Sequence, residues 1–146
     1  MPGMPKEAVI SNPEEAKKFV EDRVAEGADY IKLVSDTPGP DQESINALVR
    51  TAHDKGKVVF AHAVNLEATR MAQMAGVDII THAPLDGVMN DDEVRQMVEN
   101  KRISVPTLIM LESVCQMKGI DQERPGFAFA NALKTVMCCT MRVYLF

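Results

Sequence analysis

Three side chains able to bind or activate a ligand lie near the ends of successive apolar, β-rich segments. Lys32 lies in the first such segment, and His62 and His82 end the second and third. In parallel α/β folds, side chains at the carboxyl ends of strands converge on one rim, where reactive groups gather. Neutral imidazoles are good ligands for zinc and similar divalent ions. The paired placement therefore predicts that His62 and His82 bind one metal ion.

Each of these residues also has a purely structural alternative. A rim histidine often hydrogen-bonds loop backbone, and a rim lysine extends to water or pairs with an acid such as Asp36. If apolar neighbours desolvate Lys32 instead, its neutral amine is favoured, and a neutral amine reacts to give a Schiff base or a carbamate. The third histidine, His53, lies just before Gly56 at an expected helix end, where it would complement the helix dipole.

Helices are expected between the apolar segments, because start and stop signals alternate with them. The expected N-caps are Asn12, Asp41, Asn65 and Asn90, and Gly27, Gly56 and Gly76 end the first three helices. The strand candidates are Asp29–Val34, Lys57–His62, Val77–His82 and Ile103–Leu108, the last carrying Thr107 near its end. One helix in every gap is typical of parallel βα units, so we expect an α/β fold with four such units.

Three acids near these strands differ in their expected roles. Asp29 and Asp78 lie at equivalent strand entrances, opposite the polar rim, and are expected to fix the turns between helix and strand. Asp86 follows His82 in a loop closer to the rim.

The composition indicates one globular domain and excludes several partners. The chain has 146 residues, is 46% apolar and carries a net charge of −5 without basic runs, so neither nucleic acid nor an anionic membrane is expected as a partner. No stretch approaches the roughly 18 apolar residues of a spanning helix, and a cytoplasmic protein is expected. Cys115, Cys138 and Cys139 form no CxxC pair and are expected to be inert thiols.

Three motifs surround the candidate residues: Gly-Ala-Asp-Tyr-Ile-Lys ending at Lys32, Phe-Ala-His-Ala around His62, and Ala-Gly-Val-Asp-Ile-Ile-Thr-His-Ala-Pro around His82. With these motifs the chain resembles, over about residues 10 to 135, the amidohydrolase superfamily, especially its imidazolonepropionase-like and Xaa-Pro dipeptidase-like members. The resemblance implies a partial (β/α)8 TIM barrel in which the four segments are strands 4 to 7. It also implies that Lys32 is a lysine often carbamylated to bridge two metals, and that His62 and His82 are metal ligands.

The function implied by this resemblance is metal-dependent hydrolysis of a carbon–nitrogen bond in a small amide, cyclic amide or Xaa-Pro-like substrate, with one or two divalent ions, zinc being expected. The family's His-x-His pair and its last-strand aspartate have no counterpart here. We therefore expect an incomplete barrel domain over residues 1–137, a divergent apolar tail over 138–146, and association with another copy or a complementing barrel half.

Two alternatives to this hydrolase remain. Ala-Asp-Tyr-Ile-Lys also resembles the lysine strand of deoxyribose-phosphate aldolases, which would make the chain a Schiff-base lyase acting through Lys32. The other alternative is a non-catalytic fragment, for which the missing ligands are the reason.

Overall fold

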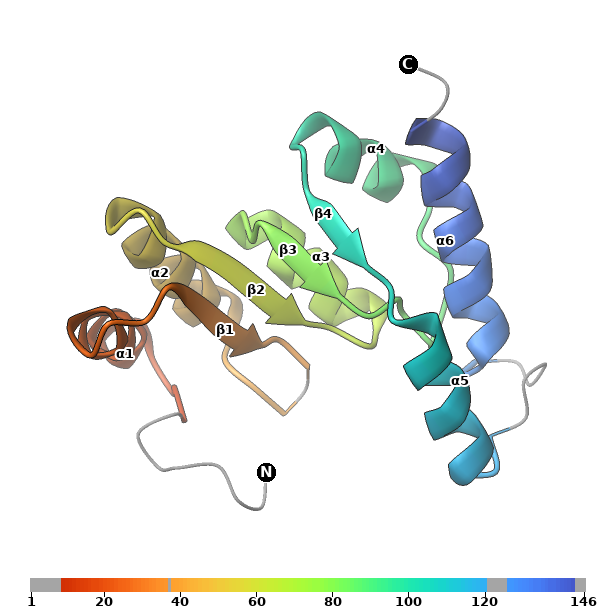
Figure 1. The fold of residues 1–146 in the computed structure, drawn as a ribbon, viewed down its shortest axis with the longest axis horizontal. Helices are drawn as coiled ribbons and strands as arrows, with labels where there is room; N and C mark the ends of the chain where they lie inside the picture. Colours follow the sequence, from red (N-terminus) through yellow and green to blue (C-terminus); the bar gives the residue numbers. More distant parts are fainter. Residues whose placement is uncertain (1–8, 37, 121–125, 144–146) are drawn as a thin grey trace.

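Four parallel strands alternate with helices, which confirms the predicted α/β fold and its βα units. The computed structural model describes residues 9–36, 38–120 and 126–143. In chain order the elements are α1 (Pro13–Ala25), β1 (Tyr30–Val34), α2 (Gln42–Asp54), β2 (Val58–His62), α3 (Leu66–Ala75), β3 (Ile79–Thr81), α4 (Asp91–Glu99), β4 (Ile103–Val105), α5 (Leu108–Met117) and α6 (Phe129–Val143). The sheet order β1-β2-β3-β4 follows the sequence (Figure 1).

The four predicted N-caps all stabilise helix starts. Asn12, Asp41 and Asn65 each accept a hydrogen bond from the backbone N–H three residues later, at 2.8 to 2.9 Å. Asn90 forms a full capping box with Glu93. These local bonds fix where each helix begins, and so where the strand before it must end.

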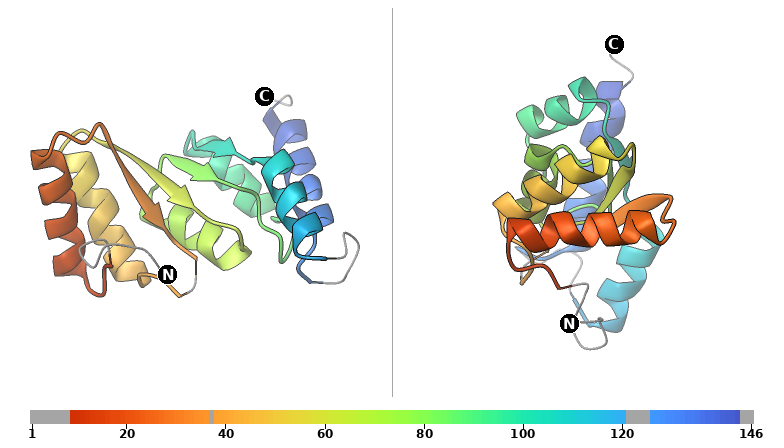
Figure 2. Two further views of the ribbon diagram at one scale, coloured as in Figure 1. Left: turned by 60° about the horizontal axis from the view of Figure 1, so that its bottom comes forward. Right: turned by 90° about the vertical axis from the view of Figure 1, so that its left-hand side faces the viewer.

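The helices α1 to α4 cover one face of the sheet, as the edge-on view in Figure 2 shows for the first three. The core lies between the two layers, where the strands contribute Ile31, Leu33, Val59, Ala61 and Ile80, each at most 5% exposed. Because side chains alternate along a strand, the residues between these point to the opposite face.

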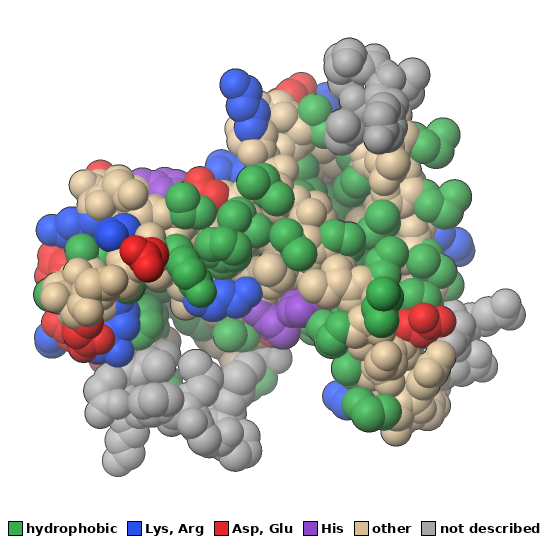
Figure 3. Space-filling view, in the orientation of Figure 1, with side chains coloured by type: hydrophobic (Ala, Val, Ile, Leu, Met, Phe, Trp, Pro, Cys, Tyr) green, Lys and Arg blue, Asp and Glu red, His purple; other side chains and the backbone are tan. Residues whose placement is uncertain are grey.

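That opposite face of the sheet carries apolar side chains that the described residues leave uncovered. Tyr30, Val58, Ile103 and Val105 are 39 to 56% exposed. In Figure 3 hydrophobic side chains spread over the strand region, with histidine at its lower margin. A complete eight-stranded barrel would enclose this face.

The fourth predicted strand, Ile103–Leu108, is longer than the strand in the structure, β4. β4 ends at Val105, because Pro106 follows and Thr107 has a left-handed backbone with φ 49°. Leu108 then begins α5, a helix that the sequence analysis did not predict. Further on, α6 runs continuously through residue 137, where we placed a boundary, so the division into barrel and tail stays a prediction.

The cysteines form no disulfide, as predicted. Cys115 is buried, and Cys138 and Cys139 are partly buried on α6. Burial, reinforced by the neighbouring Cys138, raises the pKa of the Cys139 thiol, which disfavours its reactive thiolate. Within the described ranges, no helix has both the length and the apolar character needed to cross a membrane.

Candidate metal centre

The sheet register places the predicted site residues on neighbouring strands. Val34, His62, Thr81 and Val105 form one row across the carboxyl ends of β1 to β4, and the paired Lys32 and Phe60 lie two residues earlier in β1 and β2. Residues aligned in parallel strands point to the same face, so the side chains of Lys32, His62 and Thr81 share the uncovered face.

The imidazole rings of His62 and His82 meet at the carboxyl ends of the two middle strands, β2 and β3. His82 Nε2 lies 2.8 Å from His62 Nδ1, and the ring centroids are 4.4 Å apart. His82 follows Thr81, so a regular strand would send its side chain to the helix-covered face. Its left-handed backbone, with φ 78°, breaks this alternation and allows the ring to reach His62.

A further side chain holds each ring from behind. Asp36 Oδ2 lies 3.0 Å from His62 Nε2, and Asp36 Oδ1 is fixed by Val64 N at 2.9 Å and Asn65 Nδ2 at 3.1 Å. Thr107 Oγ1 lies 2.6 Å from His82 Nδ1. Such outer partners orient metal-binding histidines and select their tautomers.

Lys32 belongs to the same cluster through Thr81. Its Nζ donates to Thr81 Oγ1 at 2.9 Å, and the Thr81 hydroxyl donates to Ala61 O at 2.9 Å. The Asp36 carboxylate, which the sequence analysis named as a partner for Lys32, contacts His62 instead.

Burial makes two members of the cluster easier to keep neutral. Desolvation lowers the pKa of His82 to about 4. The nearby His62 and Lys32 contribute smaller shifts in the same direction, and Asp36 opposes them. Desolvation also lowers the pKa of Lys32. At neutral pH His82 is therefore an uncharged imidazole with a nitrogen lone pair, which is the form that binds metals.

The cluster fits part of a metal site and not a whole one. Over the described residues, no group of three or more His, Cys, Asp or Glu is arranged to hold an ion. The two facing nitrogens and their outer partners nevertheless match what a metal-binding histidine pair requires. Two nitrogens on a tetrahedral zinc lie about 3.4 Å apart at bond lengths of about 2.1 Å, so the rings would need to separate by roughly 0.6 Å.

The remaining candidate residues lie outside this cluster. His53 Nε2 contacts Asp78 Oδ2 at 2.8 Å at the opposite end of the strands, and the same oxygen accepts from Val59 N. Asp78 thus fixes a helix-to-strand turn, as predicted, with His53 as an unpredicted partner. Asp86 accepts from Leu66 N at 2.8 Å at the start of α3.

Sequence reasoning missed the roles of Asp36 and Thr107. Asp36 follows the end of β1 by two residues, which is a recognisable rim position. Thr107 was placed near the end of the last predicted strand, but its contact with His82 was not predicted, because that contact depends on the turn after β4.

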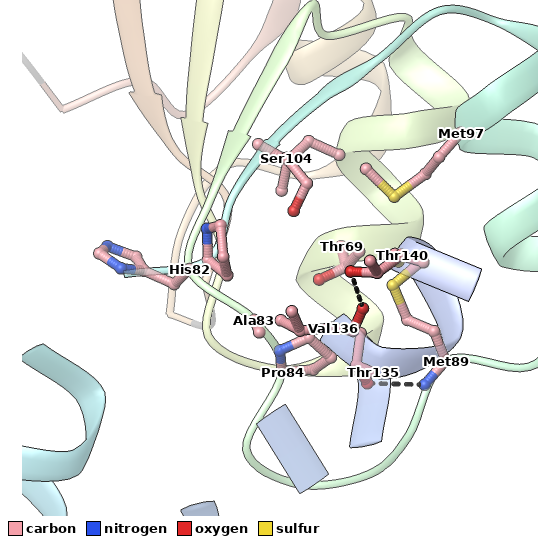
Figure 4. A pocket seen from close by; sticks show the side chains of 13 residues that line it. Thr69, His82, Ala83, Pro84, Met89, Met97, Ser104, Thr135, Val136 and Thr140 are labelled. Atoms are coloured by element: carbon pink, nitrogen blue, oxygen red, sulfur yellow. Dashed lines mark hydrogen bonds between the residues drawn. The ribbon is translucent and has the colours of Figure 1, made fainter. Parts of the chain in front are cut away.

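Two cavities border the cluster. One, of about 200 Å³, lies between the sheet and α4 and α6, and the ring of His82 points away from it (Figure 4). The other, of about 560 Å³, lies along β1, where Lys32 and apolar residues such as Phe19 and Val34 line it. The smaller cavity therefore lies on the helix side of the sheet, whereas the ring of His82 lies on the open side.

Comparison with known proteins connects this fold to a superfamily. No protein-family model matches the chain. Uncharacterised proteins of Mycobacterium tuberculosis and Mycobacterium bovis are 31% identical to it over 103 residues, which are 64% of this chain and 27% of theirs. The chain thus spans about a quarter of the curated relatives it matches.

Solved structures give the more extensive match. A Xaa-Pro dipeptidase with methionine bound in its active site superposes with a TM-score of 0.69 and 29% identity, over 93% of this chain and 35% of that one. For a putative prolidase from Bifidobacterium longum the TM-score is 0.62 and the identity 25%, over 86% and 33% of the two chains. An amidohydrolase at 22% identity and a TM-score of 0.63 supports the fold alone, over 92% and 34%.

The fold is thus that of part of an amidohydrolase-type (β/α) barrel. The structural neighbours are prolidases and amidohydrolases of the amidohydrolase superfamily, which confirms the resemblance seen in the sequence, and the chain spans about a third of their length.

Proposed function

We propose that this chain supplies part of the metal-binding rim of a hydrolase that cleaves carbon–nitrogen bonds in small amide, cyclic amide or Xaa-Pro-like substrates. The observation that carries the proposal is the meeting of His62 and His82 at 2.8 Å, with Asp36 and Thr107 behind them. The likeness to a Xaa-Pro dipeptidase at 29% identity supports the substrate class.

In this proposal His62 Nδ1 and His82 Nε2 hold a divalent ion, with zinc expected. When bound, such an ion polarises a carbonyl and lowers the pKa of water. Asp36 keeps the His62 proton on Nε2 and leaves Nδ1 free. Burial lowers the pKa of Lys32, which favours the neutral amine that a carbamate requires, and Thr81 holds this amine on the same face as His62.

Hydrolysis needs further ligands from elsewhere, because two histidines and a modified lysine leave out the His-x-His pair and the last-strand aspartate of the family. The histidine pair alone is expected to hold the ion. We propose that a complementing barrel half, or a second copy of this chain, provides the further ligands and covers the open sheet face. The exposed Tyr30, Val58, Ile103 and Val105 are the apolar surface that such a partner would bury. The cytoplasmic location expected from the sequence stays a prediction.

One observation favours a second candidate function. A lysine whose pKa is lowered by burial also suits a Schiff-base lyase, and Lys32 is such a lysine. Borohydride reduction in the presence of an aldehyde would then add mass at Lys32, whereas an unchanged mass would reject this candidate.

Metal retention tests the hydrolase proposal. The wild-type chain and the variants His62→Asn, His82→Asn and His53→Asn would be loaded with zinc, dialysed and analysed for metal, with circular dichroism to confirm folding. His53 is the matched control, because its ring contacts Asp78 at the opposite end of the strands. We expect the wild type and His53→Asn to retain zinc and the other two to lose it. Absence of zinc from the wild type, or equal retention by all four, would overturn the proposal.

A further inference from the structure

Thr107 has an unusual backbone and side chain for a helix N-cap. It precedes α5, where a threonine hydroxyl normally accepts a hydrogen bond from the first turn, yet it makes no capping bond. Its backbone is left-handed with φ 49°, which is disfavoured for a β-branched residue. No capping hydrogen bond stabilises this conformation locally, so contacts with the surrounding structure must impose it.

The hydroxyl of Thr107 contacts His82, which has a left-handed backbone of its own. Thr107 Oγ1 lies 2.6 Å from His82 Nδ1, and His82 has φ 78°. Among the described residues, Lys101 is the only other non-glycine with positive φ, and it lies at the ordinary turn after α4. Two strained residues therefore meet in one hydrogen bond at the site.

Three hydrogen bonds link Asp36, His62, His82 and Thr107 in series, and the Asp36 carboxylate sets the direction of all three. The Asp36 carboxylate is an acceptor, so His62 Nε2 donates to it and neutral His62 keeps Nδ1 unprotonated. His82 Nε2, 2.8 Å away, must then donate to His62 Nδ1. Neutral His82 therefore carries no proton on Nδ1, and the Thr107 hydroxyl donates to that nitrogen.

We propose that Thr107 is a positioning residue that serves both tautomers of His82. Without a ligand, its hydroxyl donates to Nδ1 and the imidazole proton stays on Nε2. An ion held at Nε2 would require the imidazole proton to be on Nδ1, and the same Thr107 hydroxyl would then accept from Nδ1–H. The imidazole stays neutral and its proton count is unchanged. We call the arrangement without a ligand the first state and the arrangement with an ion on Nε2 the second state. The second state rests on the proposed function, whereas the first does not.

Nitrogen-15 NMR of histidine-labelled, metal-free protein tests the first state. We expect His82 to carry its proton on Nε2 in the wild type and in Thr107→Ser. In Thr107→Val the Nδ1 signal should move downfield, toward the position of an unbonded imidazole nitrogen. Thr107→Gly, which relieves the left-handed backbone, should show the same shift if the valine variant fails to fold. Thr51→Val, which removes a hydroxyl bonded to Ala47 O in α2, should leave the signal in place.

Zinc titration of the same proteins tests the second state. Loss of the Thr107 hydroxyl is expected to weaken zinc binding about 10- to 100-fold. Thr107→Ser should bind zinc as the wild type does, and Thr51→Val should not change the zinc affinity. A proton on Nδ1 in the metal-free wild type, an unmoved signal in both hydroxyl-free variants, or unchanged zinc affinity would overturn the inference. Failure of the wild type to bind zinc, with the NMR results as expected, would reject the proposed function and leave the first state supported.

Discussion

Replacing Asp36 by asparagine changes the proton arrangement of the site while keeping the shape of the side chain. Asp36 Oδ1 accepts from Val64 N and Asn65 Nδ2, so the new amide oxygen is expected to take this position. The amide nitrogen then faces His62 Nε2, where Oδ2 lay at 3.0 Å. A donor at that place moves the His62 proton to Nδ1, the atom that faces His82.

The size of the effect follows from the burial of the carboxylate. Its side chain is 12% exposed, so water screens its contacts weakly. A hydrogen bond to a charged group contributes roughly 1.5–3 kcal/mol, and we expect Asp36→Asn to lower the free energy of unfolding by about that amount. Zinc affinity should fall about 10- to 100-fold, or about 1.4–2.7 kcal/mol, because the metal-facing nitrogen is now protonated.

Urea unfolding followed by circular dichroism and zinc competition against a chromophoric chelator measure these two quantities. Asp86→Asn is the matched control, because Asp86 also accepts a backbone hydrogen bond, from Leu66 N, and no contact joins it to either histidine of the pair. We expect this control to affect stability alone. If Asp36→Asn destabilised the fold but bound zinc as tightly as the wild type, the role of Asp36 in orienting His62 would be refuted.

Three further predictions concern pH, the core and the open face. Burial lowers the pKa of His82 to about 4 from its ordinary 6.5, so the stability contributed by neutral His82 should be complete above pH 6.5 and fall as the pH drops toward 4. Urea midpoints measured against pH should show this fall, and His82→Asn should flatten it. Ile31→Ala should cost about 2–5 kcal/mol in urea unfolding and its neighbour Tyr30→Ala much less, because Ile31 is 1% and Tyr30 56% exposed; equal costs would contradict the one-sided helix layer. Ile103→Lys should shift sedimentation toward the monomer, and unchanged sedimentation would argue against association through the open face.

The fold could be predicted from the sequence where local signals determine it. Asn12, Asp41, Asn65 and Asn90 cap helices through their own side chains, and such bonds depend on neighbours in sequence. The regular alternation of helices with apolar segments then restricted the topology to parallel βα units.

The site could be predicted only in part, because its geometry depends on tertiary contacts. Strand alternation places His62 on the open face but would send His82 to the other one, and only the left-handed backbone at His82 brings the rings together. The roles of Thr107 and of α5 were missed for a related reason. The strand preference of Ile103–Val105 gave no sign that the chain turns sharply after Pro106.

The most direct test of the shared histidine site is X-ray absorption spectroscopy at the zinc edge of the loaded protein, which counts imidazole ligands. Two imidazoles at about 2.0–2.1 Å are expected in the wild type, and no bound zinc is expected in dialysed His62→Asn or His82→Asn. A wild-type spectrum without imidazole scattering, or one that neither substitution changes, would contradict a metal ion held jointly by His62 and His82.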